Sequence, residues 1–218
     1  MAIKRRVGVL ICTIMMLLCV GCNNANTFSG EMKTNDNNNA TEIDTTGMYH
    51  IDETDSWILI PEEYILFTRD MDENSDTLKT QGLSKNDLIA YLDAYGSEFV
   101  AITPDGNMEV MLKFTKTGFG SDNLISQSED VISGYAEGLQ KGFNAEQYEL
   151  IENNEMMWVK LAYSHSVAGE TTPADYVRYA TIANGWDIYL WGASYNGKLT
   201  PQNLQELQRM WNSFFFSK

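Results

Sequence analysis

The segment 177-VRYATIANGWDIYLWGA-193 decides the fold of this chain. Two runs rich in β-branched and aromatic residues, 177–183 and 186–193, flank the dipeptide Asn184-Gly185. Both residues of this dipeptide tolerate positive φ, which the two-residue turns of tight hairpins require. The segment therefore predicts an antiparallel β-hairpin, and its turn is the strongest hairpin signal in the sequence.

Side chains on the second strand of this hairpin alternate between two faces. One face carries Trp186, Ile188 and Leu190, and the other carries Tyr189 and Trp191. Because both faces are apolar, we expect both to be partly buried, the first by the helix of Trp211. The second face is either covered by the helix of Leu88 and Leu92 or left open. If it is open, the aromatic residues from Trp186 to Tyr195 form a stacking platform for a sugar, a peptide or a partner protein.

Further strands lie on both sides of recognisable turns. Two more hairpins are expected, with strands 99–103 and 108–115 around Pro104-Asp105-Gly106-Asn107, and strands 148–152 and 156–164 around Asn153-Asn154. The early apolar run 56–61 ends at a proline and reads as a strand, with 64–68 as its expected partner.

Capping signals mark three helices. The first starts at Ser84, with Asp87 three residues on, and stops at Gly96. The second is expected from about Ser128 to Gly142, because the apolar residues in this range recur at helical spacing.

The third helix begins at Thr200 as N-cap, with Pro201 in its first turn. Its expected apolar stripe consists of Leu204, Leu207, Met210, Trp211, Phe214 and Phe215. Hairpins joined by single helices imply an antiparallel or mixed β-sheet packed by helices, and the predicted fold class is therefore α+β.

This order of elements resembles the PsbP-like fold, an α/β/α sandwich named after an extrinsic subunit of photosystem II and seen in many small bacterial lipoproteins. The resemblance is carried by 57-WILIP-61, by the hairpin at Asn184-Gly185-Trp186 and by the closing 211-WNSF-214. Most of residues 48–218 also resembles uncharacterised lipoproteins of low-GC Gram-positive bacteria. The resemblance implies a non-enzymatic role in binding or assembly, and it brings no shared catalytic residues.

The N-terminus has the pattern of a secretory signal. Basic Lys4-Arg5-Arg6 precedes an apolar run, 7–20, whose 14 residues would reach only about 21 Å as a helix, against about 30 Å for a hydrocarbon core. The following Cys19-Val20-Gly21-Cys22 resembles the lipobox of bacterial lipoproteins, although Cys19 stands where that pattern usually has Leu. This resemblance implies cleavage before Cys22 and a thioether-linked diacylglycerol on its sulfur, and two acyl chains suffice for stable anchoring.

The residues after Cys22 are rich in Asn and Thr and have little to bury. We therefore expect a signal peptide over 1–21, a flexible tether over 22–47 with a span of about 25 to 30 Å, and a single α+β domain over 48–218. The predicted location is the extracytoplasmic face of the cell membrane.

The charge balance restricts the partners of this domain. The chain has 15 basic and 30 acidic residues, and removal of the signal leaves 12 basic residues and a net charge of −18. Such a surface repels phosphate backbones, so nucleic acid is not expected as a partner. The expected partners are the membrane, through the lipid, and an unknown envelope protein or small ligand.

Few residues suited to catalysis or metal binding are present. All three cysteines lie at or before Cys22, so the domain lacks a thiol nucleophile and a Cys-based zinc site. His50 and His165 are far apart, and Ser164-His165-Ser166 places its hydroxyls beside the imidazole along an extended segment, where neighbours point to opposite faces. No catalytic residue, metal ligand or cofactor is therefore assigned.

The acidic run 70-DMDENSD-76 has oxygen ligands at the spacing of a calcium loop, but Ser75 stands where that loop needs Gly and Gln81 where it needs Glu. A solvated acidic loop is the expected structure. The function predicted from the sequence is a lipid-anchored, non-catalytic binding or assembly module of the cell envelope. The alternatives are a hydrolase using paired carboxylates in a cleft and a sensor of a wall ligand or divalent cation.

Overall fold

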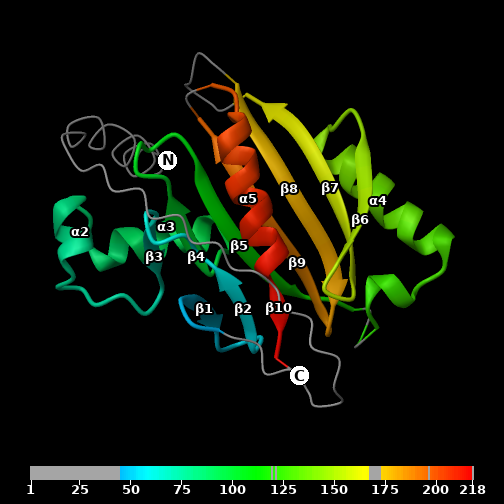
Figure 1. Ribbon diagram of the computed structural model, residues 1–218, viewed down its shortest axis with the longest axis horizontal. Coiled ribbons are helices and arrows are strands. Elements are labelled where there is room, and N and C mark those ends of the chain that lie inside the picture. Colours follow the sequence, from blue (N-terminus) through cyan, green and yellow to red (C-terminus); the bar gives the residue numbers. More distant parts are fainter. Residues whose placement is uncertain (1–44, 119, 121, 167–172, 196, 218) are drawn as a thin grey trace.

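A computed structural model describes residues 45–118, 120, 122–166, 173–195 and 197–217 (Figure 1). The expected signal segment and Cys22 lie outside these residues. The helices are α2 (Asp76–Thr80), α3 (Lys85–Tyr95), the 3₁₀ turn η1 (Leu124–Ser126), α4 (Glu129–Phe143) and α5 (Pro201–Ser213). The strands are β1 (Met48–Ile51), β2 (Ser56–Leu59), β3 (Ile65–Thr68), β4 (Phe99–Ile102), β5 (Glu109–Lys116), β6 (Tyr148–Asn153), β7 (Met156–His165), β8 (Ala174–Ala183), β9 (Trp186–Ser194) and β10 (Phe215–Phe216). Within the described ranges, no helix is long and apolar enough to cross a bilayer.

The main sheet has seven antiparallel strands in the order β3-β4-β5-β9-β8-β7-β6. Its centre is the hairpin of β8 and β9, where Ala183 pairs with Trp186 and the turn residues Asn184 and Gly185 have φ of 51° and 81°. The hairpins of β4 with β5 and β6 with β7 also form as the sequence predicts. The α+β fold class is confirmed by this antiparallel sheet and the helices packed on it.

The expected pairing of 56–61 with 64–68 is wrong. A turn closed by the Tyr64 amide on the Pro61 carbonyl carries the chain away from β2, so that β3 joins β4 in the main sheet. Strand β2 instead lies between β1 and β10 in a second, three-stranded sheet. Both partners come from segments for which the sequence analysis predicts no strand.

The third helix is shorter than expected, because it ends at Ser213 and the next residues are extended. The Ser213 hydroxyl donates to the Met210 carbonyl and accepts from the Leu59 amide at 2.8 Å, which ties the helix end to β2. Phe214 has φ −69° and ψ 129°, and the Asn154 side chain donates to its carbonyl. Phe215 therefore belongs to β10 and not to the apolar stripe of α5.

The other helix ends follow the capping signals. The Ser84 hydroxyl accepts from the Asp87 amide while the Asp87 carboxylate accepts from the Ser84 amide, and α3 ends at Gly96 with φ of 63°. Helix α4 continues slightly beyond the expected Gly142. Its left-handed cap is Asn144, with φ of 53°, because asparagine adopts this conformation at lower cost than other non-glycine residues.

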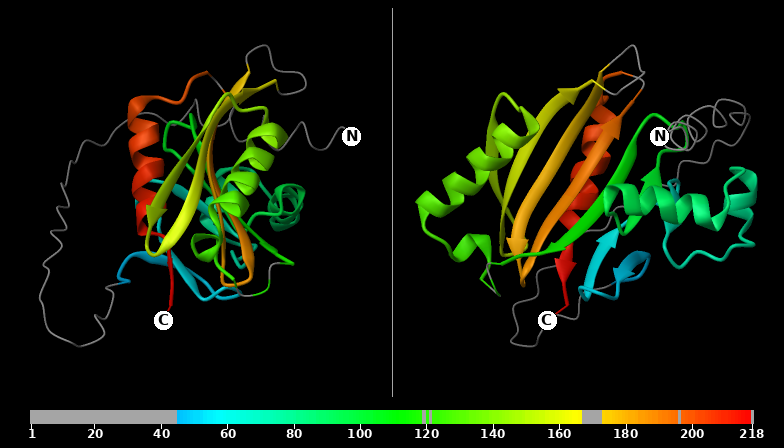
Figure 2. Two further views of the ribbon diagram at one scale, coloured as in Figure 1. Left: turned by 90° about the vertical axis from the view of Figure 1, so that its right-hand side faces the viewer. Right: turned by 180° about the vertical axis from the view of Figure 1, so that it is seen from behind.

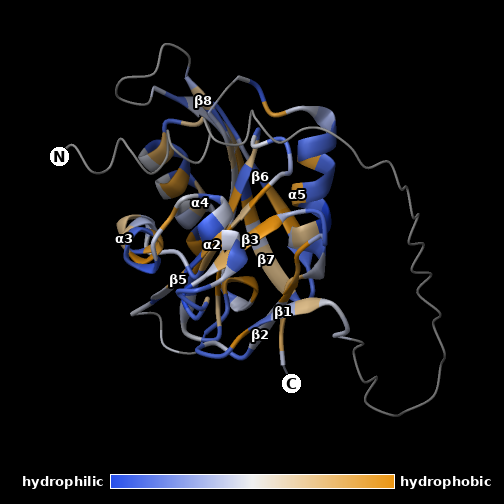
Figure 3. Cartoon of the chain, turned by 90° about the vertical axis from the view of Figure 1, so that its left-hand side faces the viewer, coloured by the Kyte–Doolittle hydropathy of each residue, from blue (hydrophilic) through white to orange (hydrophobic). Residues whose placement is uncertain are grey.

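The helices divide between the two faces of the main sheet. Helix α5 covers one face together with the small sheet, and it buries Leu207, Met210 and Trp211 while its outer side is hydrophilic (Figure 3). Helices α3 and α4 both lie on the opposite face, α3 over the β3 side and α4 over the β6 side (Figure 2). Fully buried Trp158 anchors the α5 side through edge-on contacts with Trp211 and Phe214.

Candidate functional site

Aromatic side chains gather on the sheet face between α3 and α4. In the right-hand view of Figure 2, the strands β5, β9 and β8 cross this region between the two helices without a helix in front of them. We call this region the aromatic surface and define it by Tyr91, Tyr95, Phe143, Tyr163, Tyr176, Arg178, Tyr189, Trp191 and Tyr195. Neither helix alone defines it, because its members come from α3, α4, the strands β7, β8 and β9, and Tyr195 just after β9.

The strand register brings these residues together. Arg178 of β8 pairs with Trp191 of β9, and Tyr176 pairs with Tyr163 of β7. Alternate residues of a strand point to the same face, so Tyr176 and Arg178 share one face with Tyr189 and Trp191. Antiparallel pairing thus places residues that are far apart in sequence in adjacent rows.

The rings form a nearly continuous series across the surface. Phe143 stacks on Tyr163 with ring centroids 5.4 Å apart, and Tyr163 stacks on Tyr176 at 5.1 Å with an interplanar angle of 7°. Tyr176 then meets Tyr195 edge-on at 6.3 Å. Such contacts fix the ring positions and leave polar hydroxyls at the tips of apolar rings.

The exposure of these rings answers the question left open by the sequence. Trp191 is buried against Leu88 and Leu92, as expected if the first helix covers this face. Tyr189 and Tyr176 remain half-buried, and Tyr95 at the rim is 41% exposed. The helix therefore covers part of this face, and the tyrosines between α3 and α4 remain accessible.

Arg178 lies at the centre of this surface and faces rings instead of carboxylates. Its guanidinium carbon is 4.0 Å from the centroid of Phe143, 4.8 Å from Trp191 and 5.6 Å from Tyr189. The buried Nε has no hydrogen-bond partner, and no ion pair to Arg178 forms within the described part of the chain. Burial lowers the pKa of Arg178, although an interaction with the Tyr163 hydroxyl partly opposes this change.

Two carboxylates on the same sheet face bind tyrosine hydroxyls and not Arg178. The Tyr91 hydroxyl donates to Glu109 at 2.7 Å, and the hydroxyls of Tyr135 and Tyr189 both donate to Asp187 at 2.7 Å. Glu109 is only 2% exposed, and burial raises its pKa to about 7, although the Tyr91 hydrogen bond acts in the opposite direction. Both acids are therefore satisfied without neutralising the partly buried Arg178 guanidinium.

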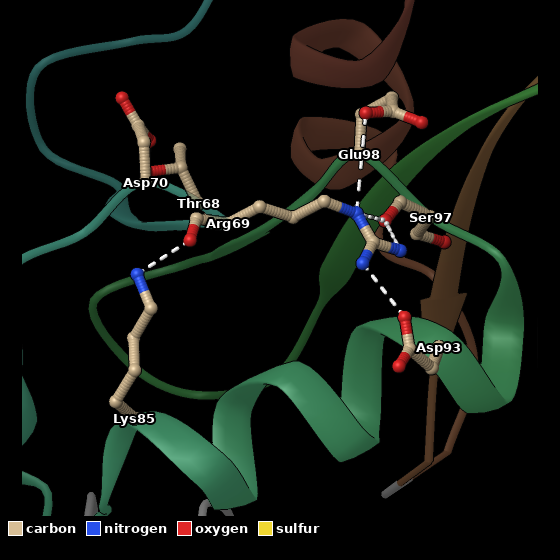
Figure 4. A network of polar contacts seen from close by, with 7 residues as sticks. All are labelled: Thr68, Arg69, Asp70, Lys85, Asp93, Ser97 and Glu98. Atoms are coloured by element: carbon tan, nitrogen blue, oxygen red, sulfur yellow. Dashed lines mark hydrogen bonds and ion pairs between the residues drawn. The ribbon is translucent and has the colours of Figure 1, made fainter.

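The environment of Arg69 shows how this fold satisfies an arginine elsewhere (Figure 4). Its guanidinium donates to the Asp93 carboxylate at 2.7 Å and, through two nitrogens, to the Ser97 carbonyl, and Glu98 lies 4.0 Å away. Arg209 on α5 likewise lies 3.8 Å from Glu206. Arg178 thus differs from both in having a buried Nε without a hydrogen bond and in lacking an acidic partner among the described residues.

A separate polar cleft of about 550 Å³ lies on the other side of the molecule, between the β4–β5 turn and the start of α5. Its lining residues are Glu63, Tyr64, Thr103, Pro104, Asp105, Asn107, Ser194, Gly197, Lys198, Thr200, Gln202, Asn203 and Glu206. Burial would raise the pKa of Asp105, but hydrogen bonds from Thr103 and Asn107 outweigh it and hold the pKa below its ordinary value. Among the described carboxyls, those with a raised pKa, Glu98 and Glu109, do not line this cleft.

The acidic run 70–76 uses its side chains for local capping. Asp70 accepts from the Thr68 hydroxyl, Asp72 from the Asn74 amide, and Ser75 caps α2 by accepting from the Leu78 amide. Among the residues that the structure describes, no three His, Cys, Asp or Glu side chains converge on a metal position.

The two histidines are placed apart. His165 is exposed at the end of β7, where the neighbouring Ser164 donates to Asp175. His50 lies between Asp52 and Asp55, at 2.8 and 2.9 Å, and its ring meets that of Trp57 in a tilted contact with centroids 4.2 Å apart. Among the contacts of the described residues, neither imidazole is hydrogen-bonded to a serine, threonine or tyrosine hydroxyl.

The sequence did not indicate Arg178 or Glu109 as candidate site residues. The available signal was a charged residue within an apolar strand. Arg178 is two residues after Tyr176 and so shares its face, and Glu109 is the first residue of the apolar run of β5. Alternation gives the face of a strand, but only the strand order shows that the two residues share one surface.

The two sheets and their helices define an α+β protein, and comparisons with known proteins add a likeness of fold. No family model and no curated protein matches the chain. Among solved structures, it is similar to cyanobacterial PsbP (CyanoP) of Synechocystis sp. PCC 6803, with 11% identity, 78% of this chain and 91% of that chain covered, and a TM-score of 0.46. It is also similar to a protein of Bacteroides thetaiotaomicron VPI-5482, with 12% identity, 75% and 46% coverage, and a TM-score of 0.43. Neither likeness assigns a site to this chain.

Proposed function

We propose that this chain is a lipid-anchored, non-catalytic binding module on the extracytoplasmic face of the cell membrane. The observation that carries the proposal is the aromatic surface, where half-exposed tyrosines surround a guanidinium that no described carboxylate neutralises. The anchor rests on Gly21-Cys22 at the end of the apolar run. Together these features give a tethered domain whose recognition surface is separate from its membrane attachment.

The chemistry of the two candidate regions favours binding over hydrolysis. A carboxylate hydrolase needs a general acid with a raised pKa beside a second carboxylate in one cleft. In the polar cleft the pKa of Asp105 is lowered, and the raised pKa of Glu109 belongs to a carboxyl only 2% exposed. Rigid aromatic rings with polar tips, in contrast, supply contact area at low entropic cost, as binding surfaces do.

Site-directed photo-cross-linking in intact cells tests this proposal. A photoreactive phenylalanine analogue replaces Tyr95 at the rim of the aromatic surface, and in a matched variant it replaces Leu204 on α5. The two side chains are 41% and 38% exposed, so nonspecific collisions are expected to label them equally. We expect a discrete adduct from position 95 and only background from position 204.

The same experiment in a Cys22→Ala chain tests the anchor. Loss of the lipid is expected to release the chain from the membrane and to reduce the adduct from position 95, because the local concentration near envelope partners falls. Equal adducts from positions 95 and 204, or no adduct from either, would contradict the proposed binding role. Unchanged membrane retention of Cys22→Ala would contradict the anchor.

A further inference from the structure

We infer that Arg178 is the anchor point for a ligand with a single carboxylate on a planar or apolar body, which the aromatic surface binds. This inference rests on the proposed function and names its ligand class. The residues that would recognise the carboxylate and the ring are Arg178, Tyr163, Tyr176 and Tyr189.

The positive charge of Arg178 has no acidic partner among the described residues. Arg178 is partly buried, and a cation removed from water without a counter-ion is costly, so folded proteins normally pair it with a carboxylate. This chain has twice as many acidic as basic residues, yet the described contacts of the Arg178 guanidinium are with aromatic side chains. Glu109 and Asp187, on the same face of the sheet, are instead bound by tyrosine hydroxyls. An external anion would supply the missing partner.

Ring contacts also fix the orientation of the Arg178 guanidinium. The ring of Phe143 lies 4.0 Å from the guanidinium carbon and that of Trp191 lies 4.8 Å away, so the planar group is held in place by rings from α4 and β9. A guanidinium fixed in this way needs little further ordering to receive two carboxylate oxygens along one edge. Pre-organisation of this kind favours a planar, bidentate anion.

The single charge of Arg178 and the rings beside it select the charge and the body of the ligand. Arg178 offers a single cation on a protein of strongly negative charge, so it would neutralise a doubly charged phosphate only in part, whereas a monocarboxylate matches Arg178 alone. Next to Arg178, the rings of Tyr163 and Tyr176 stack on each other with centroids 5.1 Å apart, and both residues are partly exposed. A planar or apolar group attached to the carboxylate would pack on these rings.

Calorimetry on the full-length chain in detergent micelles tests the inference with N-acetyl-phenylalanine and its carboxamide as probes. The two probes differ only in the charged group, and inorganic phosphate serves as a third arm. A hydrogen bond to a charged group contributes enough that the carboxylate is expected to bind about 10- to 100-fold more tightly than the carboxamide. Phosphate is expected to bind more weakly than the carboxylate.

Two variants locate the effect. Arg178→Gln is expected to remove this preference, while Arg209→Gln, which alters an exposed arginine on the opposite side of the sheet, leaves it unchanged. Amide chemical shifts of the wild-type chain locate the binding site without a variant. The carboxylate probe is expected to change the amide shifts of β8 and of the end of α4. Equal affinity for both probes, tighter binding of phosphate, or shifts confined to other elements would overturn the inference.

These outcomes separate the ligand class from the proposed function. If both probes bind equally while the cross-link from Tyr95 persists, the surface binds a partner but Arg178 does not select a carboxylate. If the cross-link is also absent, the proposed binding role itself fails.

Discussion

Replacement of Glu109 by Gln should remove a large pH dependence from the stability of this protein. Glu109 is 2% exposed on β5 and accepts a hydrogen bond from the Tyr91 hydroxyl at 2.7 Å. Burial raises its pKa from 4.5 to about 7. Because the folded state holds the proton more tightly, the stabilising contribution is fully present below pH 4.5 and is lost as the pH rises through about 7.

The size of the effect follows from the two pKa values. Their difference, from 4.5 to about 7, corresponds to about 3 kcal/mol of unfolding free energy lost by the wild type across this range. The amide oxygen of the substituted side chain can still accept from Tyr91, and the amide carries no titratable proton. The stability of Glu109→Gln relative to wild type should therefore increase by about 3 kcal/mol between about pH 4.5 and about pH 8.5.

Urea unfolding at several pH values measures this difference. Any constant cost of the new amide group cancels when the relative stability at the two pH values is subtracted. Glu62→Gln, which removes an exposed carboxyl, is the matched control, and its curve is expected to run parallel to that of the wild type. Parallel curves for Glu109→Gln and wild type would refute the reasoning that burial dominates at this position.

Three further substitutions test the packing and the helix signals by chemical denaturation. Trp158→Ala should destabilise the fold by about 3 to 5 kcal/mol, because the fully buried indole packs edge-on against Trp211; a loss under about 1 kcal/mol would contradict its place in the core. Gly138→Ala should stabilise the fold by about 0.5 to 1 kcal/mol, since this exposed site inside α4 has no atom within 4 Å of the added methyl group; destabilisation would show an unseen constraint. Ser84→Ala should cost about 1 kcal/mol through loss of the hydrogen bond from the Asp87 amide, and an unchanged midpoint would argue against the capping box.

Local signals predicted most of the fold. The Asn184-Gly185 turn, the capping box at Ser84 and the Pro201 helix start each depend on a few neighbouring residues, and each lies where the sequence places it. The predicted pairing of β2 was wrong because β2 pairs with β1 and β10, and β10 lies at the far end of the chain. A short strand such as Phe215–Phe216 carries no periodicity that could distinguish it from the end of an apolar helix.

The candidate site was only partly predictable for a related reason. The alternation along β9 correctly places Tyr189 and Trp191 on the face opposite α5. Coverage of that face depends on where two helices settle, and the role of Arg178 depends on the distance to every acid in the fold. These are properties of strand order and packing. In a sequence with 30 acidic residues, no local signal shows whether a given arginine will have an acidic partner in the fold.

The mass of the membrane-bound chain tests the central claim most directly. Intact mass spectrometry of the protein extracted from its native membrane should show a chain that starts at Cys22 and carries a diacylglycerol on that residue. An unprocessed chain that begins at Met1 and is recovered from the cytosol would contradict the account, since the aromatic surface would then face a different compartment from the one proposed.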